Sequence, residues 1–294
     1  MAWVRRLSQF KRAGLTLKAT AYAGHGGRVV IVREEGDRLL LVRQADHALL
    51  SGMLAAAWGK PPWVAPEPRA SVVVGARYHD LAWASFDETL PRRADGRPLS
   101  FLEVSRAVST QLYARGIDAV ETLDEYAGLL VSLHFSGFFT SHWGWRHRAS
   151  LELEGEEREA VSRFLDRERA RQHRLRDRLG VGPEREAELR RNYLWLQLWD
   201  RISLDVCRRG FTGWSVDYPA TPVGTGSDSR WVSLHVELQP GGRCLLDPYP
   251  LFPDQLQAQV PAAWLPLDVL ADPGRLWSAW SSGGTTIEVV FAPR

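Results

Sequence analysis

The chain lacks several features that would place it in a common class of protein. It has only two cysteines, Cys207 and Cys244, which cannot build a disulfide framework and do not have the spacing of a zinc site. No apolar run reaches the roughly 18 residues that a membrane-spanning helix needs. The N-terminal charges are not followed by the apolar core of a signal peptide. These absences predict a cytoplasmic protein with reduced thiols and no membrane partner.

The chain also lacks an excess of charge of either sign. The chain carries 37 basic and 35 acidic residues, a net charge of +2, which predicts no nucleic-acid partner. Gly-x-Ser-x-Gly, His-Glu-x-x-His and a glycine-rich phosphate loop between a strand and a helix are absent. Neither cysteine has a histidine near it in sequence, which argues against a thiol nucleophile. Oligomeric state is left undetermined by these features.

The order of patterns along the 294 residues predicts an α+β protein in three parts. Residues 1–27 form a basic N-terminal appendage that ends in a glycine-rich stretch. Residues 28–210 begin with a β-hairpin over 28–43 and continue as a helical domain. The pattern of residues 211–294 predicts a small antiparallel β module. The connection after Arg208 is short and limits independent motion, so we expect the module to pack on the helical domain. The helices are expected at about 46–58, 69–84, 100–115, 123–138, 154–179 and 184–208.

Four residues in the expected helices form a candidate metal site. They occur in the order His47, then the doublet His79-Asp80, then a distant Asp200. Imidazole and carboxylate together suit a divalent metal such as Zn, Mn or Fe. Adjacent residues on a helix point about 100° apart, so His79 and Asp80 would hold one ion between them. Asp200 interrupts an apolar helix face, where a carboxylate is costly unless it is paired or bound to metal.

The alternative for these four residues is purely structural, with Asp200 forming a salt bridge to Arg201 or another arginine. His134 lies in the apolar segment Leu-Leu-Val-Ser-Leu-His-Phe. It is either a satisfied core histidine or a contact to metal or substrate, and we assign it the catalytic role. The loop 86–98 starts directly after the doublet and is therefore expected to lie over the site.

The His, His-Asp, Asp pattern resembles that of the HD superfamily of helical metal-dependent enzymes. It maps onto His47, His79, Asp80 and Asp200. Residues 28–294 more closely resemble a bacterial family with the status of a domain of unknown function, in the stretches Tyr-His-Asp-Leu-Ala-Trp, Leu-Leu-Val-Ser-Leu-His and Trp-Asp-Arg-Ile-Ser-Leu, among others. The resemblance implies an HD-like helical bundle.

HD-superfamily members include phosphohydrolases, and also di-iron oxygenases with two further histidines. His134 fits one of those two positions, and only His142, His147 or His173 remain for the other. The leading prediction is a metal-dependent hydrolase, with a phosphoester of a small molecule as substrate and one or two Fe, Mn or Zn ions as cofactor. The alternatives are a non-haem iron oxygenase and a non-catalytic, metal-stabilised binding or sensor protein.

Overall fold

A computed structural model describes residues 29–84, 92–140, 153–224 and 230–294. Within these ranges the chain forms seven α-helices and one eight-stranded sheet, so the predicted α+β class is confirmed. The appendage predicted for residues 1–27 lies outside the described residues. No helix in the described ranges is long and apolar enough to cross a membrane. The helices are α2 (Gln44–Ala57), α3 (Arg69–Tyr78), α5 (Arg106–Leu123), α6 (Glu125–Thr140), α7 (Gly155–Leu179), α8 (Pro183–Arg209) and α9 (Pro273–Ser282).

The sheet joins the two ends of the described chain. Its strands are β1 (Val29–Glu35), β2 (Arg38–Val42), β3 (Leu99–Ser100), β4 (Trp214–Val223), β5 (Arg230–Gln239), β6 (Arg243–Asp247), β7 (Leu256–Pro266) and β8 (Gly284–Pro293). Their spatial order is β3-β1-β2-β7-β8-β6-β5-β4. The predicted hairpin is present as β1 and β2, with Glu35 opposite Arg38. Through β2, which pairs with β7, this hairpin is continuous with the C-terminal strands.

The C-terminal region differs from the small antiparallel module expected from the sequence. Two strand pairs, β1 with β3 and β6 with β8, are parallel, so the sheet is mixed. Strands β4 and β7 both contain proline, which cannot donate to a ladder. Pro219 lies at the register shift of the edge strand β4. Pro261 precedes the part of β7 that pairs with β2, so its missing N–H breaks no bond to that neighbour.

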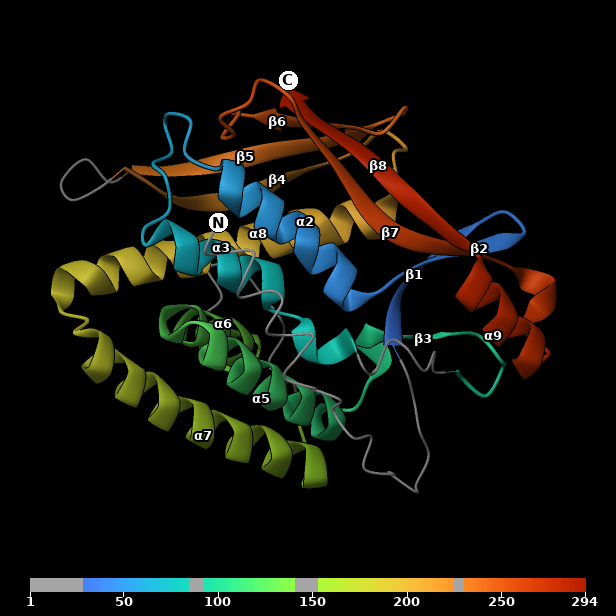
Figure 1. The fold of residues 1–294 in the computed structure, drawn as a ribbon, viewed down its shortest axis with the longest axis horizontal. Helices are drawn as coiled ribbons and strands as arrows, with labels where there is room; N and C mark the ends of the chain where they lie inside the picture. Colours follow the sequence, from blue (N-terminus) through green and yellow to red (C-terminus); the bar gives the residue numbers. More distant parts are fainter. Residues whose placement is uncertain (1–28, 85–91, 141–152, 225–229) are drawn as a thin grey trace.

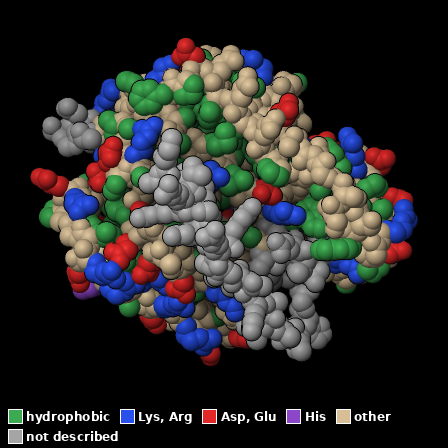
Figure 2. Space-filling view, viewed as in Figure 1, with side chains coloured by type: hydrophobic (Ala, Val, Ile, Leu, Met, Phe, Trp, Pro, Cys, Tyr) green, Lys and Arg blue, Asp and Glu red, His purple; other side chains and the backbone are tan. Residues whose placement is uncertain are grey.

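All the described helices except α9 form layers on one side of the sheet. Leu276 and Trp280 of α9 pack with Leu39 and Leu41 of β2, on the face opposite the larger core. In Figure 1, α2 and α8 lie next to the strands, α5 and α6 lie beyond them, and α7 is outermost. Helix α8 begins with proline at its first position, after Gly182, and ends at Gly210, whose φ of +65° suits glycine. Helix α7 carries a mixed acidic and basic surface, which Figure 2 shows at the lower left. Helix α5 begins at Arg106, where Ser105 caps it, rather than at the expected residue 100.

Two apolar cores fill the space between the layers. The larger core packs the sheet against α2 and α8 and includes Leu50 and Trp199. The second core packs α5 against α6 and includes Trp83 and Phe135. Trp199 precedes Asp200 and Phe135 follows His134 in the chain. The candidate residues therefore lie where the two cores meet.

Candidate metal centre

Five side chains singled out in the sequence meet at one buried place. His47 comes from the first turn of α2, His79 and Asp80 from the end of α3, His134 from α6 and Asp200 from α8. All five are buried, and Asp80 is the most exposed at 8%. Segments up to 153 residues apart in the chain are thus brought together, as is usual for sites between the helices of a bundle.

Two close helix contacts create this meeting point. A Cβ at Gly52 would lie 2.7 Å from the Cβ of Arg77, so glycine at this position allows α2 and α3 to cross at short range. Helix α2 is also tied to α8 by the hydroxyls of Ser51 and Ser203, 2.9 Å apart. Ser203 donates to the carbonyl of Asp200, so Ser51 is the donor to Ser203. These contacts place His47 beside Asp200.

The doublet does not sit within a helix as expected. Helix α3 ends at Tyr78, His79 is its C-terminal cap, and Asp80 has left the helical conformation with φ −100° and ψ 20°. A short 3-10 turn, η1 (Leu81–Trp83), follows. Because the backbone changes direction between the two residues, both side chains reach the same point. An ion between two side chains splayed on one helix face is therefore not the geometry that the structure shows.

The polar atoms of the cluster are close together. Nε2 of His47 lies 3.1 Å from Oδ1 of Asp200 and 3.6 Å from Oδ2 of Asp80. Nε2 of His79 lies 3.3 Å from Oδ1 of Asp200 and 3.7 Å from Oδ2 of Asp80. Nε2 of His134 lies 3.7 Å from Oδ2 of Asp200. Ligands about 2.0–2.1 Å from a metal stand roughly 3.0–3.5 Å apart. The two separations that involve Oδ1 of Asp200 fall in this range, and the other three are slightly longer.

Two overlapping groups of three residues could each hold an ion. One consists of His47, His79 and Asp80, and the other of His79, His134 and Asp200. Within each group the candidate ligand atoms all lie within 4.8 Å of one another. The donor set of imidazole nitrogen and carboxylate oxygen fits Zn, Mn or Fe. The chain therefore offers two sets of ligands that overlap at His79, and since one ring nitrogen binds one ion, His79 can serve only one set at a time.

His79 is oriented through its second ring nitrogen. Nδ1–H donates to the carbonyl oxygen of Ala76 at 2.9 Å. Burial lowers the pKa of His79, but the carboxylates of Asp80 and Asp200 outweigh burial and raise the pKa to about 9. At pH 7 the metal-free side chain is protonated, and Nε2 donates to Asp200. Loss of that proton leaves a lone pair on Nε2 directed at the carboxylates, which is how metal-binding histidines are held.

The other charges of the cluster follow from burial and neighbours. Burial raises the pKa of Asp80. Burial also opposes ionisation of Asp200, but hydrogen bonds from His47 and His79 hold the pKa of Asp200 well below its usual range. Burial lowers the pKa of His134 to about 3, so this imidazole is neutral at pH 7. A neutral imidazole and an ionised carboxylate are the forms that bind metal.

His134 is part of the cluster, and its surroundings are aromatic. Its ring centroid lies 4.9 Å from that of Phe138 and 5.2 Å from that of His79. The Nδ1 atoms of His134 and His47 are buried without a hydrogen-bond partner among the described residues. Buried polar atoms rarely lack a partner in proteins. These Nδ1 atoms are not the ones that face the carboxylates, so the case for a ligand in the cluster rests on the converging Nε2 and carboxylate oxygen atoms. The catalytic role of His134, and the role of the other four residues as metal ligands, stay predictions.

Other residues named in the sequence do not join the cluster in the described structure. His142, His147 and the beginning of the loop 86–98 lie outside the described residues. The described end of that loop contacts the hairpin, where Arg97 bonds Glu34 at 2.8 Å. His173 is exposed and pairs with Asp177 on α7.

Sequence reasoning missed two contributors to the site. The Ser51–Ser203 pair carries no motif, and only the packing of α2 on α8 shows it. Trp83 was not singled out, yet its side chain bonds Asp80. Its place in Tyr-His-Asp-Leu-Ala-Trp, three residues after Asp80, was the one signal available.

The fold and the cluster together define an α+β protein with a buried imidazole–carboxylate site that could hold metal. The chain belongs to the family described as Protein of unknown function (DUF3891), whose model matches residues 30–266. That range contains all five residues of the cluster. No curated protein and no solved structure matches the chain.

Proposed function

We propose that the protein is a metal-dependent hydrolase that acts on the phosphoester of a small molecule. The observation that carries the proposal is the convergence of five buried side chains whose polar atoms lie 3.1–3.7 Å apart. In this arrangement His47, His79, Asp80 and Asp200 hold one divalent transition metal ion, and His134 contacts the substrate or a second ion. A bound ion of this kind lowers the pKa of a coordinated water and polarises the scissile group.

The exposure of the cluster supports a reactant that approaches from one side. The side chains of Asp80 and Asp200 are 11% and 6% exposed, whereas those of the three histidines are 0–1% exposed. The imidazoles therefore form the closed side of the site and the carboxylates its solvent side. The resemblance to HD-superfamily phosphohydrolases favours the same chemistry.

One observation favours the di-iron oxygenase as a second candidate. The second group of possible ligands contains His134, which supplies a third imidazole beside His47 and His79. Iron enzymes that activate oxygen use histidine and carboxylate ligands with open positions. The hydrolase and the oxygenase differ in the number of ions, the identity of the metal and the use of oxygen.

The test is metal analysis followed by turnover. Protein purified without chelator is analysed for metals, and again after reconstitution with Mn, Fe or Zn. Less than about a tenth of an equivalent in every case would overturn the metal site, because buried ligand sets bind such ions tightly. Hydrolysis of 4-nitrophenyl phosphate or its diester by the loaded protein supports the hydrolase. Two irons with oxygen consumption support the oxygenase, and bound metal without either activity supports a binding or sensor protein.

A further inference from the structure

Trp83 lies directly behind the metal-facing carboxylate of Asp80. The turn η1 places the backbone N–H of Trp83 3.1 Å from the carbonyl oxygen of Asp80. The indole is buried, with 2% of its surface exposed. The side chain of Trp83 also bonds the side chain of Asp80, and since the indole nitrogen can only donate, the carboxylate accepts. One short turn thus ties the two residues together twice.

The carboxylate of Asp80 is not used as a helix cap. Aspartate before the first residue of a helix commonly accepts a bond from the backbone of the next turn. Asp80 holds that position before η1 but makes no side-chain cap bond. Its oxygen Oδ2 instead faces Nε2 of both His47 and His79. Within the turn, the carboxylate of Asp80 accepts its hydrogen bond from the indole of Trp83 instead of from a backbone N–H.

The position of Trp83 is itself fixed by the second core. Its ring packs edge-on against Tyr113 of α5, with 6.0 Å between centroids. Beside it, a Cβ on Gly116 would lie 3.1 Å from the Cβ of Ala82, so α5 and η1 are in close contact. The indole therefore has little freedom to turn away from Asp80.

Other buried tryptophans do not share this bonding. Four of them have an indole N–H without a hydrogen-bond partner among the described residues: Trp58, Trp63, Trp195 and Trp199. They pack against one another in the larger core, with centroid distances of 5.4–6.2 Å. Their contribution is apolar contact, whereas Trp83 adds a directed bond to a candidate ligand.

We propose that Trp83 is a positioning residue that orients the Asp80 carboxylate for metal binding. The inference rests on the proposed metal site and adds a residue outside the five-residue cluster. A hydrogen bond from a fixed indole restricts rotation of the carboxylate and withdraws charge from it. Partners of this kind typically change metal affinity by 10–100-fold. The bond thereby sets both the affinity of the site and the geometry around the ion.

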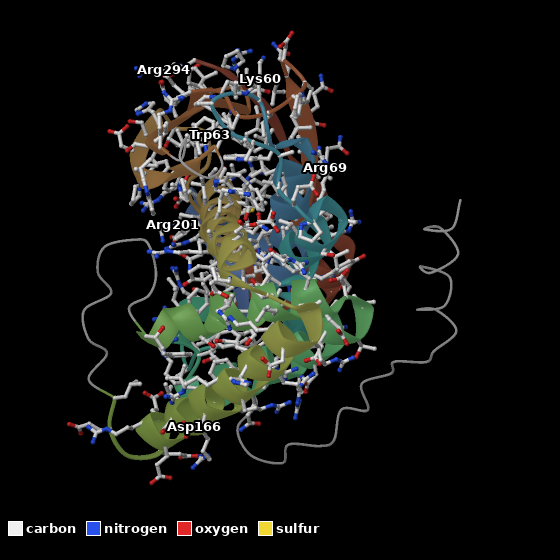
Figure 3. The ribbon with its side chains drawn as sticks, turned by 90° about the vertical axis from the view of Figure 1, so that its left-hand side faces the viewer. Lys60, Trp63, Arg69, Asp166, Arg201 and Arg294 are labelled. Atoms are coloured by element: carbon white, nitrogen blue, oxygen red, sulfur yellow. The ribbon has the colours of Figure 1, made fainter. Side chains whose placement is uncertain are left out.

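The test compares Trp83→Phe with Trp63→Phe. Both changes remove an indole from a buried position, but only the first removes a bond to a candidate ligand. Trp63 lies on the sheet side of the molecule beside Lys60, as Figure 3 shows. Metal-free protein is titrated with Co²⁺, and the visible spectrum reports the coordination of the ion. Melting of the metal-free variants controls for loss of fold.

We expect Trp83→Phe to raise the dissociation constant for Co²⁺ by about 10–100-fold and to change the Co²⁺ spectrum. Trp63→Phe should match the parent in both. Equal behaviour of the two variants would overturn the role of Trp83 while leaving the metal site intact. If the parent binds no Co²⁺, the proposed function fails and this inference fails with it.

Should Trp83→Phe not fold, benzothienylalanine at position 83 replaces only the N–H with sulfur at nearly constant shape. Weaker Co²⁺ binding by that protein supports the proposal, and binding equal to the parent overturns it.

Discussion

At the residue scale, the cluster concentrates charge in a place where charge is costly. An ionised carboxylate in the interior needs partners, and Asp200 obtains them from His47 and His79. In the metal-free protein the protonated His79 balances part of the carboxylate charge. A divalent ion would replace that proton and neutralise both carboxylates. The carboxylates of Asp80 and Asp200 would therefore face a positive charge both in the metal-free protein and in the metal-bound protein.

Replacing a single ligand should separate metal binding from folding. His79→Ala removes the residue shared by both groups of possible ligands. We expect the metal affinity to fall by more than the 10–100-fold typical of residues that act through a ligand. The protein should remain folded, because the two cores are built mostly from other residues. Titration with Mn²⁺ and circular dichroism measure the two properties.

His173→Ala is the matched control for this prediction. His173 is 82% exposed on α7 and contacts Asp177 of the same helix. This variant should bind Mn²⁺ like the parent. Metal binding of parental strength by His79→Ala would show that the doublet is structural and would refute the assignment of ligands.

At the element scale, the distance between helices decides whether the site exists. Helices α2 and α3 cross at Gly52, next to Arg77. His47 lies one turn before this crossing and His79 lies just after it. Small residues allow such close approach, and any larger side chain must push the helices apart or distort them.

Gly52→Ala should therefore weaken both stability and metal binding. The added Cβ would lie 2.7 Å from the Cβ and 3.0 Å from the Cα of Arg77, so the helices must move. Overpacking of this kind costs about 1–3 kcal/mol. Urea unfolding measures the stability and Mn²⁺ titration measures the affinity.

Gly274→Ala serves as the control, because a Cβ there meets only Asp272 at an ordinary 3.4 Å. Alanine is the better helix former, so this change should be neutral or stabilising. Equal stability of the two variants would contradict the close helix crossing.

The outer helix α7 is attached by a network of charges. Arg171 bonds carboxylates on α5 and α7, those of Asp118, Glu121 and Glu168. Burial raises the pKa of Asp118, but hydrogen bonds from Arg171 and Arg167 outweigh it and lower the pKa. A carboxyl whose pKa is lowered by folding stabilises the protein above its unfolded pKa. That contribution is lost as the pH falls through the native pKa.

Asp118→Asn should consequently lower the stability at pH 7 more than at pH 3. The loss at pH 7 is small, since the carboxylate is half exposed and salt bridges of this kind contribute about 0–1 kcal/mol. Urea midpoints at the two pH values give the comparison. Asp166→Asn, which removes an exposed pair with Arg169, should leave both midpoints near those of the parent. A constant difference between Asp118→Asn and the parent at both pH values would contradict the prediction.

At the scale of the whole molecule, the sheet makes the two ends of the described chain depend on each other. The hairpin strand β2 lies between β1 and β7. Leu40 and Leu41 of this strand are buried, and both lie opposite residues of β7. Helix α8 also packs against both β1 and β4. The strands after residue 210 therefore complete the core that the helices begin.

A chain that ends at Gly210 should aggregate or melt at a lower temperature. The truncation leaves β2 as an exposed edge strand with apolar side chains, a known cause of aggregation. Size-exclusion chromatography and thermal melting measure the effect. A chain without residues 1–27 is the control and should melt like the full protein, as expected for an appendage. A soluble 1–210 chain that melts like the full protein would refute the interdependence.

Local patterns in the sequence were sufficient for several elements and for the members of the cluster. The hairpin follows from two apolar runs around a turn, and α8 from its apolar periodicity between Gly182 and Gly210. Asp200 and His134 could be named because a polar side chain inside an apolar helix needs a partner. His47, His79 and Asp80 could be named because imidazole and carboxylate together suit a metal. Such signals depend on neighbours in the chain, so they can be read without coordinates.

Contacts between distant segments could be decided only by the tertiary structure. The pairing of β2 with β7 joins residues more than 200 positions apart, and no local pattern specifies it. Strands β4 and β7 both contain proline, and only the partner strands show that β4 accommodates Pro219 at a register shift and that Pro261 lies opposite Thr286 of β8. The end of α3 at Tyr78, which turns Asp80 toward the histidines and Trp83 toward Asp80, depends on packing against α5. The sequence by itself therefore determined which residues form the candidate centre, and the packing of the helices determined their geometry.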